Sequence, residues 1–207
     1  MDAPSKFNEH FLNFNLATSE TVQDFKRYLT NSPAFSMYLA PTNNTEVEEV
    51  LNSLDSDTPG YDDISPKVLK CSSKILSIPL AHIINLSLRT GTFPQKLKLA
   101  KVIPIFKSGD RTNVNNYRPI SILSAFSKIF EKIISFRLIN YLNRHNLLTE
   151  HQHGFRAQHS TESAILEFVK NVYACLEEKL YVMGIFLDFS KAFDTLDHEI
   201  LLYELEH

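Results

Sequence analysis

The sequence predicts an α+β fold in which helices dominate and a small antiparallel hairpin is the main β element. Apolar residues recur at helical spacing in four stretches between residues 45 and 176. Two short β-branched runs, 99–107 and 117–123, flank a turn, and a third such run follows at 181–189. The chain has 207 residues, of which 43% are hydrophobic, and this is enough for one or two globular units.

The first predicted helix follows a linker or arm that occupies residues 1–44. This arm mixes Asn, Ser, Thr and Pro with scattered aromatic residues and shows no sustained core pattern. Thr45 and Glu48 have the spacing of a capping box, and apolar residues follow at helical intervals up to Leu54. Turn-forming residues from Asp57 onward are expected to end this helix.

A second helical stretch is predicted from Ser65 to Arg89. Ser65 suits the N-cap, and Pro66 suits the first helical position because the N–H there has no intrahelical partner. Pro79 predicts a kink or break within the stretch, and Gly91 predicts its end. The apolar residues of this stretch are expected in the core.

Residues 99–107 and 117–123 are the two predicted strands of the hairpin. A polar, turn-rich loop joins them. Pro104 has no N–H to donate to a neighbouring strand, so the first strand is expected at an edge. The hairpin would carry Lys107 on one arm and Arg118 on the other.

Two further helices are predicted after the hairpin. Ser124 caps the first, which ends at 144–146 and is expected to turn four charged residues outward, namely Lys128, Glu131, Lys132 and Arg137. Ser160 or Thr161 caps the second, and Gly154 before it is expected to have an unusual backbone angle. The predicted inner face of the second helix is apolar and consists of Ala164, Ile165, Phe168, Val169, Val172, Tyr173 and Leu176.

The last predicted strand, Tyr181 to Phe189, carries a carboxylate at its exit. A carboxylate there is costly to desolvate, so Asp188 is expected either to pair with a cation or to lie on the rim of a site. Oxygen ligands of this kind suit Mg²⁺. Most such acids are structural, so a metal ligand and a plain strand-end acid both stay open from the spacing. Asp194 and Asp197 are expected to serve as helix-turn and cap acids.

Charge is distributed unevenly along the chain. Residues 64–144 hold fourteen Lys and Arg against two acidic residues, whereas the segments on either side are acidic and the whole chain has a net charge of −3. A basic block of this kind predicts a polyanionic partner such as a nucleic acid. A solubilising helix surface is the alternative for a charge run taken by itself.

Composition argues against several other classes of protein. The sequence has neither an apolar run of about 18 residues nor a signal peptide, so we expect a soluble intracellular chain without a membrane partner, in an undetermined compartment. Cys71 and Cys175 fit neither a disulfide framework nor a metal spacing, which indicates a reducing environment. His151, His153 and His159 lack Cys partners and do not match a closed zinc site.

The run from Gly184 to His198 resembles motif A of reverse transcriptases. From residue 188 it reads Asp-Phe-Ser-Lys-Ala-Phe-Asp-Thr-Leu-Asp-His, the form found in non-LTR (LINE-type, jockey-like) retrotransposons. The resemblance implies that Asp188 holds metal ions and that the backbone carbonyl of Phe189 binds one of them. It also implies that Phe193 lies under the incoming sugar and rejects a 2′-hydroxyl.

Three earlier blocks, at 59–69, 102–123 and 152–161, resemble fingers elements of the same family. By this resemblance Lys107 and Arg118 grip the triphosphate of the incoming nucleotide, a role that suits a point charge and a bidentate guanidinium. Arg156 would lie near the template, where it either touches nucleic acid or braces a loop. The basic helix face with Lys128 and Lys132 would lie near template phosphates.

The resemblance therefore implies an RNA-directed DNA polymerase, an enzyme of template-directed nucleotidyl transfer that uses two Mg²⁺ ions. Its partners would be an RNA template, a DNA primer and deoxynucleoside triphosphates. The fold would be the mostly helical fingers and the first palm strand of a right-hand polymerase, with the palm truncated. This divides the chain into an upstream arm at 1–44, a fingers region at 45–180 and the start of the palm at 181–207.

The family's Asp-Asp hairpin would lie beyond His207, so we expect this chain alone to bind nucleic acid weakly and to lack synthesis. A non-catalytic RNA-binding or interaction module derived from a retrotransposon is the alternative function. A non-functional relic of a mobile element is a further alternative. The sequence does not indicate the oligomeric state.

Overall fold

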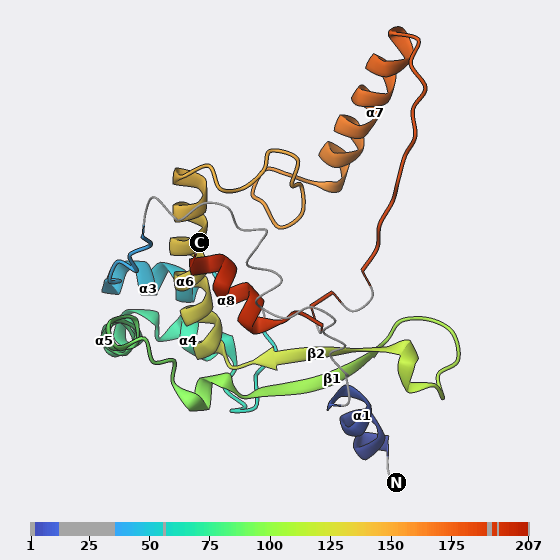
Figure 1. Cartoon of the computed structure of the whole chain (residues 1–207). Coiled ribbons are helices and arrows are strands. Elements are labelled where there is room, and N and C mark those ends of the chain that lie inside the picture. The colour runs from blue at the N-terminus through green and yellow to red at the C-terminus, as the bar shows by residue number, and fades with distance from the viewer. Residues whose placement is uncertain (1–2, 13–35, 56, 190–191, 194, 207) are drawn as a thin grey trace. The chain divides into compact units, whose positions relative to one another are not determined.

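The computed structural model describes residues 3–12, 36–55, 57–189, 192–193 and 195–206 of the chain (Figure 1). Its elements are α1 (Ala3–Leu12), α3 (Asn44–Asn52), α4 (Pro66–Cys71), α5 (Ser73–Thr90), η1 (Gln95–Lys98), β1 (Ala100–Phe106), η2 (Val114–Asn116), β2 (Tyr117–Leu123), α6 (Ala125–Arg144), α7 (Thr161–Glu177) and α8 (His198–Glu206). Mostly helical structure with a two-stranded antiparallel sheet confirms the α+β class. The chain divides into two compact units, residues 1–139 with 194–207 and residues 140–193.

The core of the first unit lies between α3, α4, α5 and the first part of α6. Apolar side chains from these four helices, together with Leu54 just after α3, form one buried cluster, and removing their surface from water is the main force that holds the unit together. The cluster consists of Val47, Leu51, Leu54, Leu69, Leu80, Ala81, Ile84, Ala125, Ile129, Phe130 and Ile133.

Helix ends in this unit follow the predicted capping chemistry with two corrections. The predicted capping box of Thr45 is wrong, because Asn43 is the N-cap of α3 and its side chain accepts a hydrogen bond from the backbone N–H of Glu46. Ser65 caps α4 as predicted, and Gly91 ends α5 with a left-handed φ of 64°. The second stretch breaks at Ser72, between α4 and α5, whereas Pro79 lies within the continuous α5.

A buried arginine fixes the segment that leads into α3. Arg137 was expected to face outward, but its side chain is only 11% exposed and forms a bidentate ion pair with Glu46. The same guanidinium donates hydrogen bonds to the backbone carbonyls of Ala40 and Pro41, at 2.8 and 3.2 Å. Asn85 on α5 holds the backbone N–H and carbonyl of Thr42 at 2.7 and 2.8 Å. Residues 40–42 are thereby tied to both α5 and α6.

The junction between β2 and α6 is closely packed. Ser124 is buried and caps α6, because its hydroxyl accepts a hydrogen bond from the N–H of Ser127 at 3.1 Å. The hydroxyl of Ser127 in turn donates to the carbonyl of Leu97 at 2.6 Å. Gly60 lies directly against this junction, and a Cβ placed there would come within 2.7 Å of the backbone N and Cα of Ser124.

The hairpin forms as predicted, and α1 packs on one of its faces. β1 and β2 pair antiparallel from Ala100 opposite Leu123 to Phe106 opposite Tyr117. The ring of Phe7 on α1 meets the ring of Tyr117 edge-on, with centroids 4.8 Å apart.

The second unit differs most from the prediction. Ser160 caps α7 as expected, through a reciprocal capping box with Ser163. The apolar face of α7 is not in a core, since this helix has no buried residue and Ile165, Phe168 and Tyr173 are exposed. The prediction of a core-facing stripe is therefore wrong for this helix.

The predicted strand from Tyr181 to Phe189 is also absent. Residues 180–189 form an irregular segment with exposed side chains. A strand requires a neighbour that accepts and donates its backbone hydrogen bonds, and no described segment pairs with this one. Further on, the carboxylate of Asp197 caps α8 by accepting from the N–H groups of Glu199 and Ile200, as predicted. Asp194 lies outside the described residues.

We predict that Gly60→Ala destabilises the chain by about 1–3 kcal/mol, because the added methyl group overlaps backbone atoms that cannot move aside easily. Chemical denaturation followed by circular dichroism measures this. Gly154→Ala is the matched control, since a Cβ there would meet no atom within 4 Å. Equal stability of the two variants would contradict the close packing at Ser124.

We also predict that Arg137→Met lowers the free energy of unfolding by about 3 kcal/mol at pH 7, because it removes the cation paired with Glu46 and the donor of two backbone carbonyls. The hydrogen bonds from Arg137, and secondarily from Thr42, lower the pKa of Glu46 against an opposing effect of burial. A lowered pKa stabilises the fold above the unfolded-state pKa of about 4.3, and this contribution disappears as the pH falls through the folded-state value.

The difference between wild type and Arg137→Met should therefore shrink in acid. Denaturation curves at pH 7 and at pH 3 test this. Arg144→Met, which removes an exposed arginine of the same helix, is the control. A difference that stays constant with pH would show that the ion pair with Glu46 is not the cause.

Candidate functional site

The two cations predicted on the hairpin share one of its faces. Side chains alternate along a strand, and Ile105 lies opposite Arg118. Lys107 is two residues beyond Ile105, so Lys107 and Arg118 are diagonal neighbours on the same face. Lys101, opposite Ile122, projects from this face as well. We call Lys101, Lys107 and Arg118 the cationic hairpin face.

This face is open to solvent. All three of its cations are exposed, and so are the apolar residues between them, Ile103, Ile105 and Ile120. The opposite face carries Phe106 and Tyr117, and α1 packs there through Phe7. Three exposed positive charges on one face of the hairpin form a surface that can bind a polyphosphate.

Asp188 and its neighbours are exposed in the second unit. The side chains of Asp188, Phe189 and Phe193 are all open to solvent. The ring of Phe193 meets that of Phe155 edge-on, with centroids 5.9 Å apart and planes at 88°. The carboxylate of Asp188 is thus not sealed in apolar packing. The described residues hold no group of three or more His, Cys, Asp or Glu that could bind a metal ion.

Arg156 braces a turn. Its guanidinium donates to the backbone carbonyl of Thr149 at 2.6 Å, and its side chain is half-buried. The expected unusual angle at Gly154 is wrong, because Phe155 takes the left-handed conformation instead, with a φ of 60°. The left-handed backbone angle of this turn therefore falls on the residue that follows the glycine.

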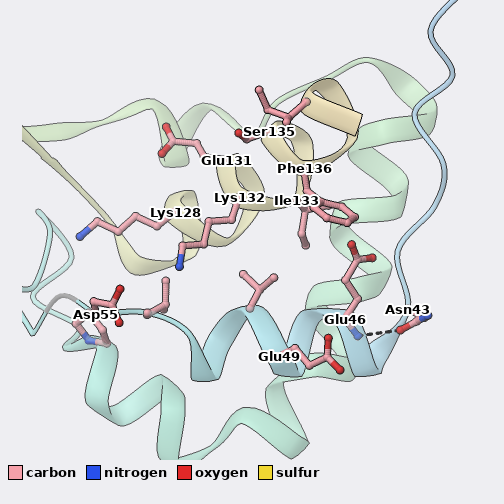
Figure 2. A pocket seen from close by; sticks show the side chains of 14 residues that line it. Asn43, Glu46, Glu49, Asp55, Lys128, Glu131, Lys132, Ile133, Ser135 and Phe136 are labelled. Atoms are coloured by element: carbon pink, nitrogen blue, oxygen red, sulfur yellow. Dashed lines mark hydrogen bonds between the residues drawn. The ribbon is translucent and has the colours of Figure 1, made fainter. Parts of the chain in front are cut away.

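Lys128 and Lys132 line a groove between α3 and α6 (Figure 2). The ammonium group of Lys132 donates to the backbone carbonyl of Ser53 at 2.9 Å and to its hydroxyl at 3.1 Å, so it stabilises the end of α3. Burial raises the pKa of Glu131 in this groove, and the nearby charge of Lys128 opposes that effect. The acidic residues Glu49 and Asp55 line the same groove. Positive charge is therefore mixed with negative charge here, in contrast to the hairpin face.

Comparison with known proteins identifies the family. Residues 105–207, which include most of the hairpin and Asp188, match the family model of reverse transcriptase (RNA-dependent DNA polymerase). The chain belongs to the reverse transcriptase family. This is a family of nucleotidyltransferases that depend on divalent metal ions.

Relatives of known name come from mobile elements of Drosophila melanogaster. The chain is 32% identical over 198 residues to the probable RNA-directed DNA polymerase from transposon BS, and the matched region covers 95% of the chain and 22% of that protein. It is 31% identical to the probable RNA-directed DNA polymerase from transposon X-element, over 92% of the chain and 21% of that protein. It is 31% identical to the RNA-directed DNA polymerase from mobile element jockey, over 97% of the chain and 22% of that protein.

The chain thus spans about a fifth of the length of these relatives. It resembles the polymerases of non-LTR elements, as the motif resemblance implied. None of the helices in the described part of the chain is both long and apolar enough to span a membrane.

Sequence reasoning missed Lys101 as a member of the cationic hairpin face. The signal was present in the alternation of side chains, since Lys101 and Lys107 are an even number of residues apart. Their relation to Arg118 needed the strand register, which the ten-residue connection between Phe106 and Tyr117 leaves open in the sequence.

We predict that inorganic tripolyphosphate binds the cationic hairpin face. Lys107→Ala and Arg118→Ala should each weaken its affinity about tenfold, because each removes a charge-assisted contact. Calorimetric titration at two salt concentrations measures this, and affinity should fall as salt rises. Lys74→Ala, which removes an exposed lysine of α5, should leave affinity unchanged. An equal loss in Lys74→Ala would indicate non-specific charge attraction.

Proposed function

We propose that this chain forms the nucleotide-binding and metal-binding part of an RNA-directed DNA polymerase of a mobile element. The reaction would add a deoxynucleotide to the 3′-hydroxyl of a DNA primer under the direction of an RNA template. The observation that carries this proposal is the cationic hairpin face, where Lys107 and Arg118 lie side by side on an exposed surface of a reverse transcriptase.

On this proposal the hairpin grips the triphosphate of the incoming nucleotide. The planar guanidinium of Arg118 binds two phosphate oxygens, and the ammonium of Lys107 adds a compact charge beside it. Lys101 is on the same face and adds a third positive charge. Such fixed cations stabilise the charge that develops on the leaving pyrophosphate.

Asp188 would supply a carboxylate ligand for Mg²⁺, and Phe189 would supply its backbone carbonyl. Both are oxygen donors in an exposed segment, which fits an ion that keeps several waters and shares its remaining positions with substrate phosphates. Two Mg²⁺ ions would lower the pKa of the primer 3′-hydroxyl and hold the pyrophosphate. A two-ion site requires more carboxylates than Asp188 alone, and these would come from other segments of a complete polymerase.

Phe193 would lie under the sugar of the incoming nucleotide and exclude a 2′-hydroxyl. Its exposed ring, packed edge-on against Phe155, presents an apolar surface that cannot satisfy a hydroxyl group. Arg156, Lys128 and Lys132 are assigned to the template side. Acidic residues line the groove around Lys128 and Lys132, and this supports a weaker contribution to nucleic-acid binding from these two lysines than from the hairpin.

In this proposal the chain has the organisation of a right-hand polymerase. Residues 1–44 form an arm upstream of the polymerase, residues 45–180 form the fingers and residues 181–207 begin the palm. The exposed apolar side chains of 181–187 support a role for this segment as a strand that pairs within a larger palm sheet.

The proposal predicts that Asp188 is essential for synthesis. The chain replaces the matching segment of the Drosophila jockey polymerase, and primer extension on an RNA template is measured with Mg²⁺ and deoxynucleotides. We expect Asp188→Ala to lower the rate by about 1,000-fold, because it removes a charged group that stabilises the transition state, while binding to template and primer stays intact. Glu177→Ala, which removes an exposed carboxylate of α7, is the control.

Synthesis by Asp188→Ala at the rate of the control would refute the proposal. Binding of RNA without any synthesis by the unsubstituted chimaera would favour the other candidate, a non-catalytic RNA-binding module. The isolated chain is expected to bind nucleic acid weakly and to give no extension product.

A further inference from the structure

The loop 107–116, which includes η2, connects β1 to β2 and carries Lys107 at its start. The N–H of Lys107 donates to the carbonyl of Asn116 at 2.8 Å, so these two residues form one more hydrogen-bonded pair of the hairpin. Because such pairs alternate along an antiparallel ladder, Ile105 and Arg118 form the preceding one. Lys107 and Arg118 therefore belong to the last two hydrogen-bonded pairs, and the loop decides where Lys107 stands.

The side chain of Asn116 closes this loop from the inside. Its Nδ2 donates to the carbonyl of Asp110 at 2.8 Å, and its backbone N–H donates to the carbonyl of Asn113 at 3.1 Å. Gly109 lies against the same side-chain amide with a φ of 90°, and a Cβ placed there would come within 2.8 Å of Nδ2. Asn116 thus ties together the start, the turn and the end of the loop.

The loop keeps its own charged groups away from the cationic hairpin face. Both carboxylate oxygens of Asp110 accept hydrogen bonds from Thr112, one from its N–H at 2.9 Å and one from its hydroxyl at 2.7 Å. The guanidinium of Arg111 lies over the ring of Phe106, which belongs to the opposite face, at 5.1 Å from the ring centroid. Within the described ranges no ion pair joins Asp110 to a cation, so this carboxylate does not neutralise Lys107.

The two cations at the end of the ladder are available to a ligand. Neither the ammonium of Lys107 nor the guanidinium of Arg118 has a hydrogen-bond or ion-pair partner among the residues that the structure describes, and both side chains are exposed. A cation contributes most to affinity when its backbone is already in place, because ordering it during binding costs free energy. The contacts that hold the backbone of Lys107 therefore bear directly on phosphate binding.

We propose that Asn116 is a positioning residue that holds Lys107 beside Arg118 for the binding of a triphosphate. Its backbone carbonyl anchors the N–H of Lys107, and its side chain ties down the loop that would otherwise let this pair open. Asn116 does not bind phosphate itself and acts through Lys107. The inference rests on the proposed function of the cationic hairpin face and adds the residue that fixes the spacing of two of its cations.

Removing the side chain of Asn116 should lower affinity through Lys107 alone. With the loop untied, Lys107 occupies the position that binding requires for only part of the time, and the apparent affinity falls by that fraction. We expect Asn116→Ala to weaken the binding of tripolyphosphate about fivefold, less than the removal of Lys107 itself. The amide of Lys107 should also lose most of its protection from hydrogen exchange, because its bond to residue 116 opens more often.

A double-mutant cycle separates positioning from a general loss of structure. Calorimetric titration of the full chain with tripolyphosphate gives the affinity of each variant. Asn116→Ala should change affinity less than about twofold when Lys107 is already alanine, but should keep its effect of about fivefold when Arg118 is alanine. A substitution that merely unfolds the hairpin would weaken binding in both backgrounds. Asn115→Ala removes only a side-chain contact to Asn113, so it is the control and should bind as the wild type does.

Gly109→Ala tests the same contact without removing Asn116. The added methyl group would displace the side-chain amide of Asn116 and should reproduce its loss of affinity. Gly91→Ala is the matched control, since Gly91 also has a positive φ but a Cβ there would meet no atom within 4 Å. Wild-type affinity of Asn116→Ala would overturn the inference, and so would an equal loss with and without Lys107. Affinity that depends on neither Lys107 nor Arg118 would overturn the phosphate site of the proposed function as well.

Discussion

The junction between β2 and α6 is the constraint on which the first unit depends. Three separate contacts converge on it: the backbone of Gly60 packs against Ser124, Ser124 caps α6, and Ser127 holds the carbonyl of Leu97. The hairpin leaves the helical core at this point. Because the junction cannot shift without breaking a buried hydrogen bond or a close backbone contact, it fixes how β1 and β2 project from the core.

Local chemistry made most of this unit predictable, and long-range contacts account for the errors. Ser65, Pro66, Gly91 and Ser124 act through neighbours within a few residues, so their roles follow from spacing alone. Arg137 was misplaced because its partners lie more than 90 residues earlier in the chain. The sequence pattern of α6 distinguishes its apolar stripe from its polar one. It does not reveal that the carboxylate of Glu46, on α3, lies beside the polar stripe.

The second unit shows that composition does not identify the partner against which a strand or a helix packs. Residues 181–189 have the β-branched and aromatic composition of a strand, yet a strand exists only as part of a pair, and composition carries no information about the partner. The same holds for α7, whose apolar stripe predicts burial without specifying what covers it. The candidate site was predictable to a similar extent: its residue types followed from motifs, whereas the shared face of Lys107 and Arg118 depended on strand register.

The histidines before α7 show that residue types alone do not identify the partners of a cluster of side chains. Three histidines within nine residues suggest a metal, and the absence of cysteine partners argues against one, but neither consideration identifies Glu167. That carboxylate lies on the helix, one turn beyond the capping box, and it binds two of the three imidazoles. His153 contacts Glu167 through Nε2 and the hydroxyl of Ser163 through Nδ1, so the helix holds its ring at both nitrogens. The contacts of His151 and His153 therefore join the turn before α7 to the helix itself, through a carboxylate that only the folded chain brings near them.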